Sequence, residues 1–148
     1  MPNFMEQRRL ARMIDKTSKQ LGAVSVPEKG WIASVRRALG MSAEQVALRK
    51  GVSRNAVYQA ERSEKEGAVS LKQMEQLAKA MGGRFVYAIV ADGRIEDIKY
   101  SQALIKAKML IKEEPDLASW STDDRQDWIE DKAAELLHDM PPSFWEPE

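Results

Sequence analysis

Apolar residues recur every three or four positions through most of this chain, which is the spacing of amphipathic helices. Counted with their capping residues, the predicted helices cover 4–21, 31–39, 42–50, 53–62, 70–81 and 95–112, and a last one that starts at Ser121 or Thr122. Glycine or proline follows several of these segments and ends them. The pattern predicts a mainly α fold, with N- and C-terminal helices on either side of a central group.

Two helices on either side of Gly51 carry the clearest start and stop signals. Ser42 and Gln45 make the Ser-x-x-Gln pattern of a capping box, and Gly51 suits the left-handed residue of a tight turn. Ser53 is placed to cap the next helix. The small residues on the expected inner face of that helix are Ala56, Val57 and Ala60. We therefore predict a helix-turn-helix whose second helix is free to enter the major groove of DNA.

The helix before this motif has apolar residues at helical spacing. Its expected inner face consists of Trp31, Ile32, Val35 and Leu39. Arg36 and Arg37 are expected to point outward. After the motif, the charged residues 64–68 are predicted to form a loop.

Residues 84–91 have a different composition. The run Phe85-Val86-Tyr87-Ala88-Ile89-Val90 is rich in β-branched and aromatic residues, which favours a strand. Such a strand is apolar on both faces, and the sequence offers no second convincing strand to pair with it. We therefore predict antiparallel pairing with the same strand of a second copy across a two-fold axis. The predicted homodimer interface consists of Phe85, Tyr87 and Ile89.

The charged residues are unevenly distributed, although the formal net charge is zero. Residues 1–83 hold 15 Lys and Arg against 8 Asp and Glu, whereas residues 84–148 hold 8 against 15. A basic front half and an acidic back half predict different partners, or attract each other. The predicted regions are an N-terminal helix and linker (1–29), a helix-turn-helix domain (30–83), a dimerisation strand (84–93) and an acidic C-terminal helical region (94–148).

The composition favours a cytoplasmic protein that does not contact a membrane. The longest apolar run, residues 85–91, is much shorter than the roughly 18 residues that a spanning helix requires. Arginines interrupt the N-terminal segment, so it does not resemble a signal peptide. The absence of cysteine excludes disulfides and thiolate metal sites and fits a reducing compartment.

An enzyme is disfavoured by the residues present. The only histidine, His138, lies near the end of the last predicted helix, where positive charge suits the helix dipole. The sequence contains no glycine-rich phosphate loop and no His/Cys metal spacing. The acidic run over 123–131 is explained by helix-start charges and a solvated face. We expect no catalytic residue, no metal and no cofactor.

Two segments leave alternatives open. The helix over 4–21 has a basic face, which indicates an ordinary helix docked on the core or an arm that touches phosphate or a partner. Its basic residues are Arg8, Arg9, Arg12, Lys16 and Lys19. Phe144 and Trp145 are expected either to pack on the protein itself or to anchor a partner.

The motif and its surroundings resemble known families. The similarity to the repressor-type helix-turn-helix proteins of the xenobiotic-response-element family lies in Leu39-Gly40-Met41-Ser42, Val46-Ala47, the run from Gly51 to Arg62, Ser70-Leu71 and Leu77-Ala78. The N-terminal helix, Gly30-Trp31-Ile32, the run from Phe85 to Val90 and Pro142-Ser143-Phe144-Trp145-Glu146 resemble the family called mobile mystery protein A. This resemblance implies a lambda-repressor-like DNA-binding domain.

Members of that family are typically encoded beside a Fic-domain protein. The resemblance therefore implies a transcriptional repressor that is the antitoxin-like partner of a Fic-domain toxin and autoregulates its operon. The alternative is an interaction module that inhibits such a toxin without significant DNA binding. The Ser/Thr-x-x-x-Glu-Gly/Asn pattern of Fic inhibitors is not matched, because Arg62 stands four residues before Glu66.

The resemblance places base contacts on the outer face of the third central helix. Arg54 can pair with guanine, Asn55 or Gln59 with adenine, and Tyr58 can contact a thymine methyl group or a phosphate. The predicted phosphate contacts are Ser42, Lys50, Ser53, Arg62 and Arg36. A homodimer would read double-stranded DNA as a palindromic operator.

Overall fold

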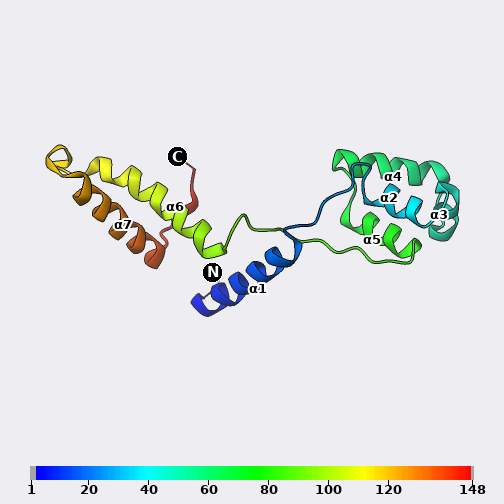
Figure 1. Ribbon diagram of the computed structural model, residues 1–148, viewed down its shortest axis with the longest axis horizontal. Coiled ribbons are helices and arrows are strands. Elements are labelled where there is room, and N and C mark those ends of the chain that lie inside the picture. Colours follow the sequence, from blue (N-terminus) through cyan, green and yellow to red (C-terminus); the bar gives the residue numbers. More distant parts are fainter. Residues whose placement is uncertain (1–2, 148) are drawn as a thin grey trace. The chain divides into compact units, whose positions relative to one another are not determined.

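The computed structural model describes residues 3–147, and every regular element in this range is a helix (Figure 1). The chain divides into two compact units. The central unit, named for its place in the sequence, comprises Ala23–Ala88, and the flanking unit combines the residues up to Gly22 with those from Ile89 onward. The outermost residues of the predicted terminal regions, 1–2 and 148, lie outside the described range. Within that range, no helix combines the length and the apolar character needed to span a membrane.

Four helices build the central unit. They are α2 (Trp31–Ala38), α3 (Ala43–Lys50), α4 (Arg54–Glu66) and α5 (Leu71–Ala80). Their shared core consists of Ile32, Ala43, Val46, Ala47, Val57, Ala60, Met74, Leu77, Ala80 and Met81. The predicted inner positions Val46, Val57 and Ala60 are confirmed, because each lies fully inside this core.

Helix α2 faces the core differently from the prediction. Ile32 is buried as expected. The other predicted inner residues are each more than a third exposed, namely Trp31, Val35 and Leu39. Ala33 and Arg36 are buried instead, so the expectation that Arg36 points outward is wrong. The cause is tertiary: Glu61 of α4 places a carboxylate 2.6 Å from the Arg36 Nε, and a paired charge can be buried.

The flanking unit is built on a helical hairpin. Helix α6 (Ile95–Leu110) continues into the short 3₁₀ helix η1 (Ile111–Glu113), and η2 (Leu117–Ser119) leads to α7 (Thr122–Asp139), which lies beside α6 (Figure 1). The cap of α7 is Ser121, whose Oγ accepts a hydrogen bond from the Asp124 amide at 3.0 Å. The fully buried alanines, which let the two helices approach closely, are Ala103, Ala107 and Ala133.

A final 3₁₀ helix, η3 (Pro142–Trp145), completes the core of the hairpin. Phe144 is 1% exposed and packs in the same cluster as Leu136. Its carbonyl accepts a hydrogen bond from the Gln102 side chain at 2.7 Å, which ties η3 to α6. Of the two alternatives for the aromatic pair, self-packing therefore holds for Phe144, whereas Trp145 remains exposed.

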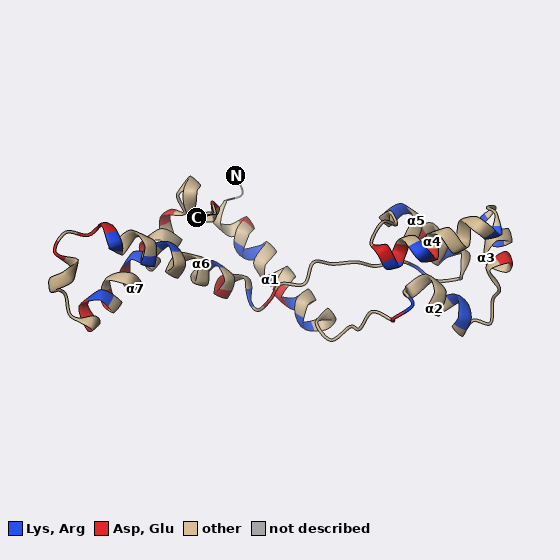
Figure 2. Cartoon of the chain, turned by 90° about the horizontal axis from the view of Figure 1, so that it is seen from above, with Lys and Arg blue, Asp and Glu red and all other residues tan. Residues whose placement is uncertain are grey.

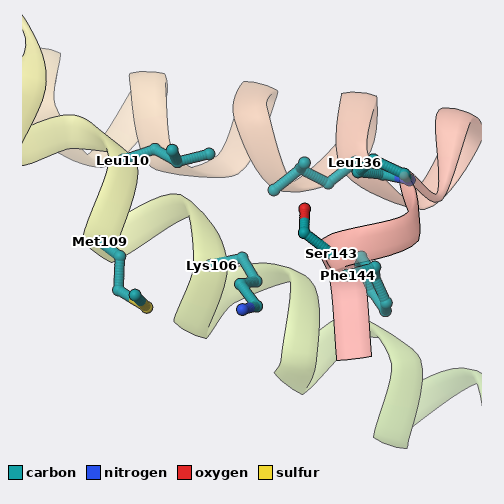
Figure 3. Close-up of a pocket in the computed structure, with 7 residues that line it drawn as sticks. Lys106, Met109, Leu110, Leu136, Ser143 and Phe144 are labelled. Carbon is teal, nitrogen blue, oxygen red and sulfur yellow. The ribbon is translucent and has the colours of Figure 1, made fainter. Parts of the chain in front are cut away.

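A small cavity remains where η3 meets the hairpin (Figure 3). Its volume is about 150 Å³, and its lining consists of Lys106, Met109, Leu110, Leu136, Pro141, Ser143 and Phe144. The Lys106 Nζ donates to the Glu146 carbonyl at 2.8 Å, while the Ser143 hydroxyl points toward Leu136 in Figure 3. The cavity is therefore a gap in a mainly apolar core, with the ammonium group held by the backbone.

Helix α1 (Phe4–Leu21) has the predicted bounds and belongs to the flanking unit. Two hydrogen bonds fix its second half to the segment before α6. The Ser18 Oγ accepts from the Ala91 amide at 3.0 Å, and the Asp15 Oδ1 accepts from the Ile95 amide at 2.9 Å. Since no side chain at the N-cap of α6 makes this bond, Asp15 satisfies one of the free amides at the start of that helix.

The predicted strand is wrong. Residues 84–91 form an irregular segment, and residues 3–147 contain no strand, so the β-strand expected to pair across a homodimer is not seen. Phe85 is half-buried against the central core, and its ring stacks on Tyr87 with centroids 5.8 Å apart. Tyr87 and Ile89 are 70% and 92% exposed. The β-branched composition favours an extended backbone, but a strand also needs a hydrogen-bonded neighbour, and the described range supplies none.

Candidate nucleic-acid interface

Local hydrogen bonds fix the turn between α3 and α4. Ser42 and Gln45 form the predicted capping box: the Ser42 Oγ accepts from the Gln45 amide at 3.1 Å, and the Gln45 Oε1 accepts from the Ser42 amide at 2.8 Å. Gly51 ends α3 with φ of +83°, which glycine adopts without strain. The Ser53 Oγ accepts from the Ala56 amide at 3.1 Å and starts α4. The local sequence therefore sets where α4 begins.

Helix α4 separates an apolar inner face from a polar outer face. Val57 and Ala60 are completely buried, and they hold the inner face against the core. The side chains on the opposite face are all exposed, namely Arg54, Asn55, Tyr58, Gln59 and Arg62. The first turn contains no acidic residue, so the positive end of the helix dipole is left for an anion. The exposure of the outer face is confirmed, while its base contacts stay a prediction.

A buried ion pair lies behind this face. The Arg36 Nε donates to the Glu61 Oε1 at 2.6 Å, its Nη2 to Oε2 at 3.4 Å, and its Nη1 to the Met41 carbonyl at 3.1 Å. Both charged side chains are almost buried, at 9% and 12% exposed. The guanidinium also lies 6.0 Å from the centre of the Tyr58 ring, within the range of a cation–π contact. The ion pair fixes α4 against α2, and its guanidinium contacts the ring of Tyr58 on the outer face.

A second carboxylate of α4 caps α2. The Glu64 carboxylate accepts from the Trp31 amide at 2.5 Å and from the Ile32 amide at 2.8 Å, which satisfies two free amides at the start of α2. Gly30 precedes them with φ of +86°, and a Cβ there would lie 3.0 Å from that carboxylate. The backbone conformation therefore favours glycine, and a Cβ would in addition crowd the Glu64 carboxylate. The predicted loop over 64–68 is wrong at its start, because α4 continues to Glu66.

Polar contacts on the outer face orient one of the predicted base-reading groups. The Arg62 Nη2 donates to the Gln59 Oε1 at 2.8 Å, and the Gln59 Nε2 lies 3.4 Å from the Ser63 Oγ. These bonds are exposed to solvent, so exchanging them for bonds to a base costs little. Arg62 therefore positions the Gln59 amide at the surface that the sequence singled out.

The predicted phosphate contacts fall into two groups. Ser42, Ser53 and Arg62 are exposed and Lys50 is partly exposed, and the two serines stand at helix starts where backbone amides favour an anion. Arg36 differs, because it is 7% exposed and its Nε, Nη1 and Nη2 atoms each donate a hydrogen bond to Glu61 or to the Met41 carbonyl inside the protein. This burial disfavours its assignment as a phosphate contact, which stays a prediction.

Glu61 and Glu64 are the residues that the sequence analysis missed. Both lie toward the inner side of α4, three positions apart, and both bind α2. A signal existed in the sequence, because the register that buries Val57 and Ala60 also turns Glu61 and Glu64 inward. The apolar pattern gives no weight to such acids, since their burial depends on a partner from another helix.

Comparison with known proteins finds a similarity to a described domain over this interface. Residues 32–87 match the protein-family model HTH_3, helix-turn-helix, a range that covers nearly all of α2 and the whole of α3, α4 and α5. The match supports a lambda-repressor-like helix-turn-helix domain, which is typical of DNA-binding transcription regulators rather than of enzymes. No curated protein and no solved structure matches the chain.

Proposed function

We propose that this chain is a sequence-specific transcriptional repressor that binds its operator through the outer face of α4. The premise is the helix-turn-helix match over residues 32–87. The observation that carries the proposal is the exposed polar face of α4, whose opposite side is anchored by Val57 and Ala60. A helix held in this way can enter the major groove, which is wide enough for one helix and displays a distinct pattern for each base pair.

Each outer residue has a chemical role in this proposal. Arg54 pairs with O6 and N7 of guanine, and Asn55 or Gln59 pairs with N6 and N7 of adenine. Tyr58 contacts a thymine methyl group or a phosphate. The residues that hold phosphates, and so fix the register of the helix on the duplex, are Ser42, Lys50, Ser53 and Arg62.

A homodimer fits this role, because one helix reads only a few base pairs. Two copies related by a two-fold axis would read a palindromic operator with half-sites about one helical turn, roughly 34 Å, apart. Phe85 is partly buried against the central core. Tyr87 and Ile89 are exposed apolar side chains that are available for contact between copies. Sedimentation at operator-binding concentrations tests the dimer, and a chain that stays monomeric on a single half-site would contradict it.

Replacement of Arg54 by alanine tests the base-reading assignment. A bidentate contact to guanine discriminates by about 1–3 kcal/mol, so Arg54→Ala should relax preference at one base position of each half-site. Selection from a pool of randomised duplexes measures this preference. Lys79→Ala is the matched control, because it removes one exposed positive charge at the end of α5. An unchanged preference in the Arg54 variant would reject the assignment.

The proposal includes an antitoxin-like role toward a Fic-domain toxin whose gene lies beside this one. Its support is the resemblance of the segments outside the helix-turn-helix, and the exposed Trp145 adds an aromatic side chain of the kind that anchors partners. Co-expression of this chain with the toxin should give a complex of the two proteins and should restore the growth of cells that the toxin inhibits. Trp145→Ala should weaken the complex and leave operator binding unchanged. A toxin that is neither bound nor neutralised contradicts this role and leaves the repressor standing.

A further inference from the structure

An open groove with several charged lining residues lies within the flanking unit, between the second half of α1 and the segment that leads into α6. Its volume is about 590 Å³, and its lining consists of Arg12, Asp15, Lys16, Ser18, Lys19, Ala91, Gly93 and Arg94. Four of these residues carry a positive charge and one carries a negative charge. The excess of positive charge makes this groove attractive to an anion.

Hydrogen bonds across the groove fix its two walls relative to each other. Ser18 holds the Ala91 amide and Asp15 holds the Ile95 amide, so α1 and the 91–95 segment are joined at two points. The single carboxylate is therefore engaged at the start of α6, where it faces the positive end of a helix dipole. Its negative charge is partly compensated there, which leaves the four cations dominant.

The cations continue beyond the groove as a stripe along α1. Arg8, Arg12, Lys16 and Lys19 follow one another at spacings of four, four and three residues, so they share one helix face. That face lies beside the side of α1 that buries Ala11, about a quarter of a turn away around the helix axis. All four side chains are exposed, and none belongs to any of the ion pairs found among residues 3–147. Figure 2 shows that Lys and Arg positions occur along α1.

We infer that the groove and the stripe bind the phosphate backbone of duplex DNA next to the operator. The inference rests on the proposed function and adds a second, sequence-independent contact to it. Lys19 lies eleven positions after Arg8, so the stripe extends about 16 Å along the helix axis. Duplex DNA presents a phosphate charge about every 1.7 Å of its axis and matches such a length, whereas a single free phosphate occupies only one position on it.

This second contact has a consequence for affinity. The flanking unit is covalently joined to the central unit, so binding of α4 to an operator raises the local concentration of DNA around α1. The stripe then strengthens binding without reading bases, because phosphate contacts carry no sequence information. Operators with flanking duplex should therefore bind more tightly than operators cut at their ends.

The test compares two variants of the full chain that lose the same charge. Lys16→Gln/Lys19→Gln removes two cations from the groove, and Lys108→Gln/Lys112→Gln removes two exposed cations elsewhere in the flanking unit. Circular dichroism confirms that both variants fold. Affinity is measured from low to physiological salt on an operator with flanks and on the same operator without them.

The groove variant should lower the steepness of the plot of log affinity against log salt by about 2, since each phosphate contact contributes about 0.9 to that slope. It should also lose the advantage of the flanked duplex, while keeping the same preferred operator. The control variant should retain the slope and the advantage. Arg12→Gln, a separate substitution in the same groove, should lower the slope by about 1.

The outcomes separate the inference from the proposed function. If the wild-type chain prefers its operator but the groove variant keeps the full slope, the inference fails alone. If the slope falls while the wild-type chain shows no sequence preference, the proposed repressor fails and the groove contact stands. A chain that binds no duplex overturns both. Loss of binding to anionic phospholipid vesicles, with no change on DNA, assigns the stripe to a membrane surface and overturns the inference.

Discussion

The two units of this protein use charged side chains in different ways. In the central unit, Arg36 and Glu61 join two helices across the interior, and their hydrogen bonds hold the supporting side of α4. In the flanking unit, ion pairs such as Lys132–Glu135 join side chains one turn apart on the surface of α7, where such a pair contributes little to stability. Helices α6 and α7 of that unit meet instead through buried alanines and the Phe144 side chain.

This difference corresponds to what each unit does in the proposed function. A short helix that must meet base edges needs a defined orientation, and a directional buried pair supplies it at the cost of desolvating two charges. A hairpin needs only close contact between two long helices, which small side chains supply without directional bonds. The following changes break or sharpen this contrast.

The largest expected effect is on the buried ion pair. Glu61→Ala leaves the Arg36 guanidinium buried without a counter-charge, so the central unit should lose about 3–5 kcal/mol of unfolding free energy. Chemical denaturation followed by amide hydrogen exchange resolves the loss by unit, and the flanking amides should be unaffected. The double variant Arg36→Met/Glu61→Leu should recover most of the stability. A loss below about 0.5 kcal/mol, the size of a surface pair, would erase the contrast.

A smaller loss of stability is expected when the buried Phe144 side chain, which completes the core of the hairpin, is removed. Phe144→Ala should cost the flanking unit about 3 kcal/mol, near the lower end for a buried phenylalanine, because η3 can settle into the existing cavity. Trp145→Ala is the matched control, since that neighbouring ring is 53% exposed. The same denaturation series measures both variants. Equal losses from the two substitutions would show that η3 does not complete the core.

The smallest expected effects are equal in the two units. Ser53 caps α4 and Ser121 caps α7 through the same hydrogen bond, at 3.1 and 3.0 Å. Alanine at either position should therefore cost its own unit about 1 kcal/mol. Ser101→Ala, at an exposed position within α6, serves as the control and should cost nothing. Unequal losses of stability from these two substitutions would mean that tertiary packing changes how much the same cap hydrogen bond stabilises a helix.

Local chemistry made part of the fold predictable. The bounds of α1, the capping box of α3 and the cap of α4 follow from residues within four positions of each other, and the structure has all three. The face of α2 that is buried could not be predicted in this way, because the burial of Arg36 depends on Glu61, which is 25 positions away in the sequence. The prediction of a strand over residues 84–91 failed for a similar reason. Its composition favours an extended chain, but a strand exists only with a partner strand.

The candidate site shows the same division. The exposure of Arg54, Asn55 and Gln59 follows from helical spacing and from the small residues opposite them, so the sequence was sufficient. Helical spacing turns Glu61 and Glu64 inward, but the groups that they bind could not be derived from it, because these depend on where α2 passes. The outward orientation expected for Arg36 was wrong for the same reason, because its partner Glu61 lies on another helix.

The separation of the flanking unit into two stretches of sequence has a consequence during synthesis on the ribosome. Residues 23–88 are made as one continuous stretch, so the central unit has all its helices before α6 and α7 are translated. Helix α1 emerges first, yet the amides held by Ser18 and Asp15 follow 73 and 80 residues later. The central unit can therefore fold cotranslationally, whereas α1 can make these contacts only after the rest of the flanking unit has been translated.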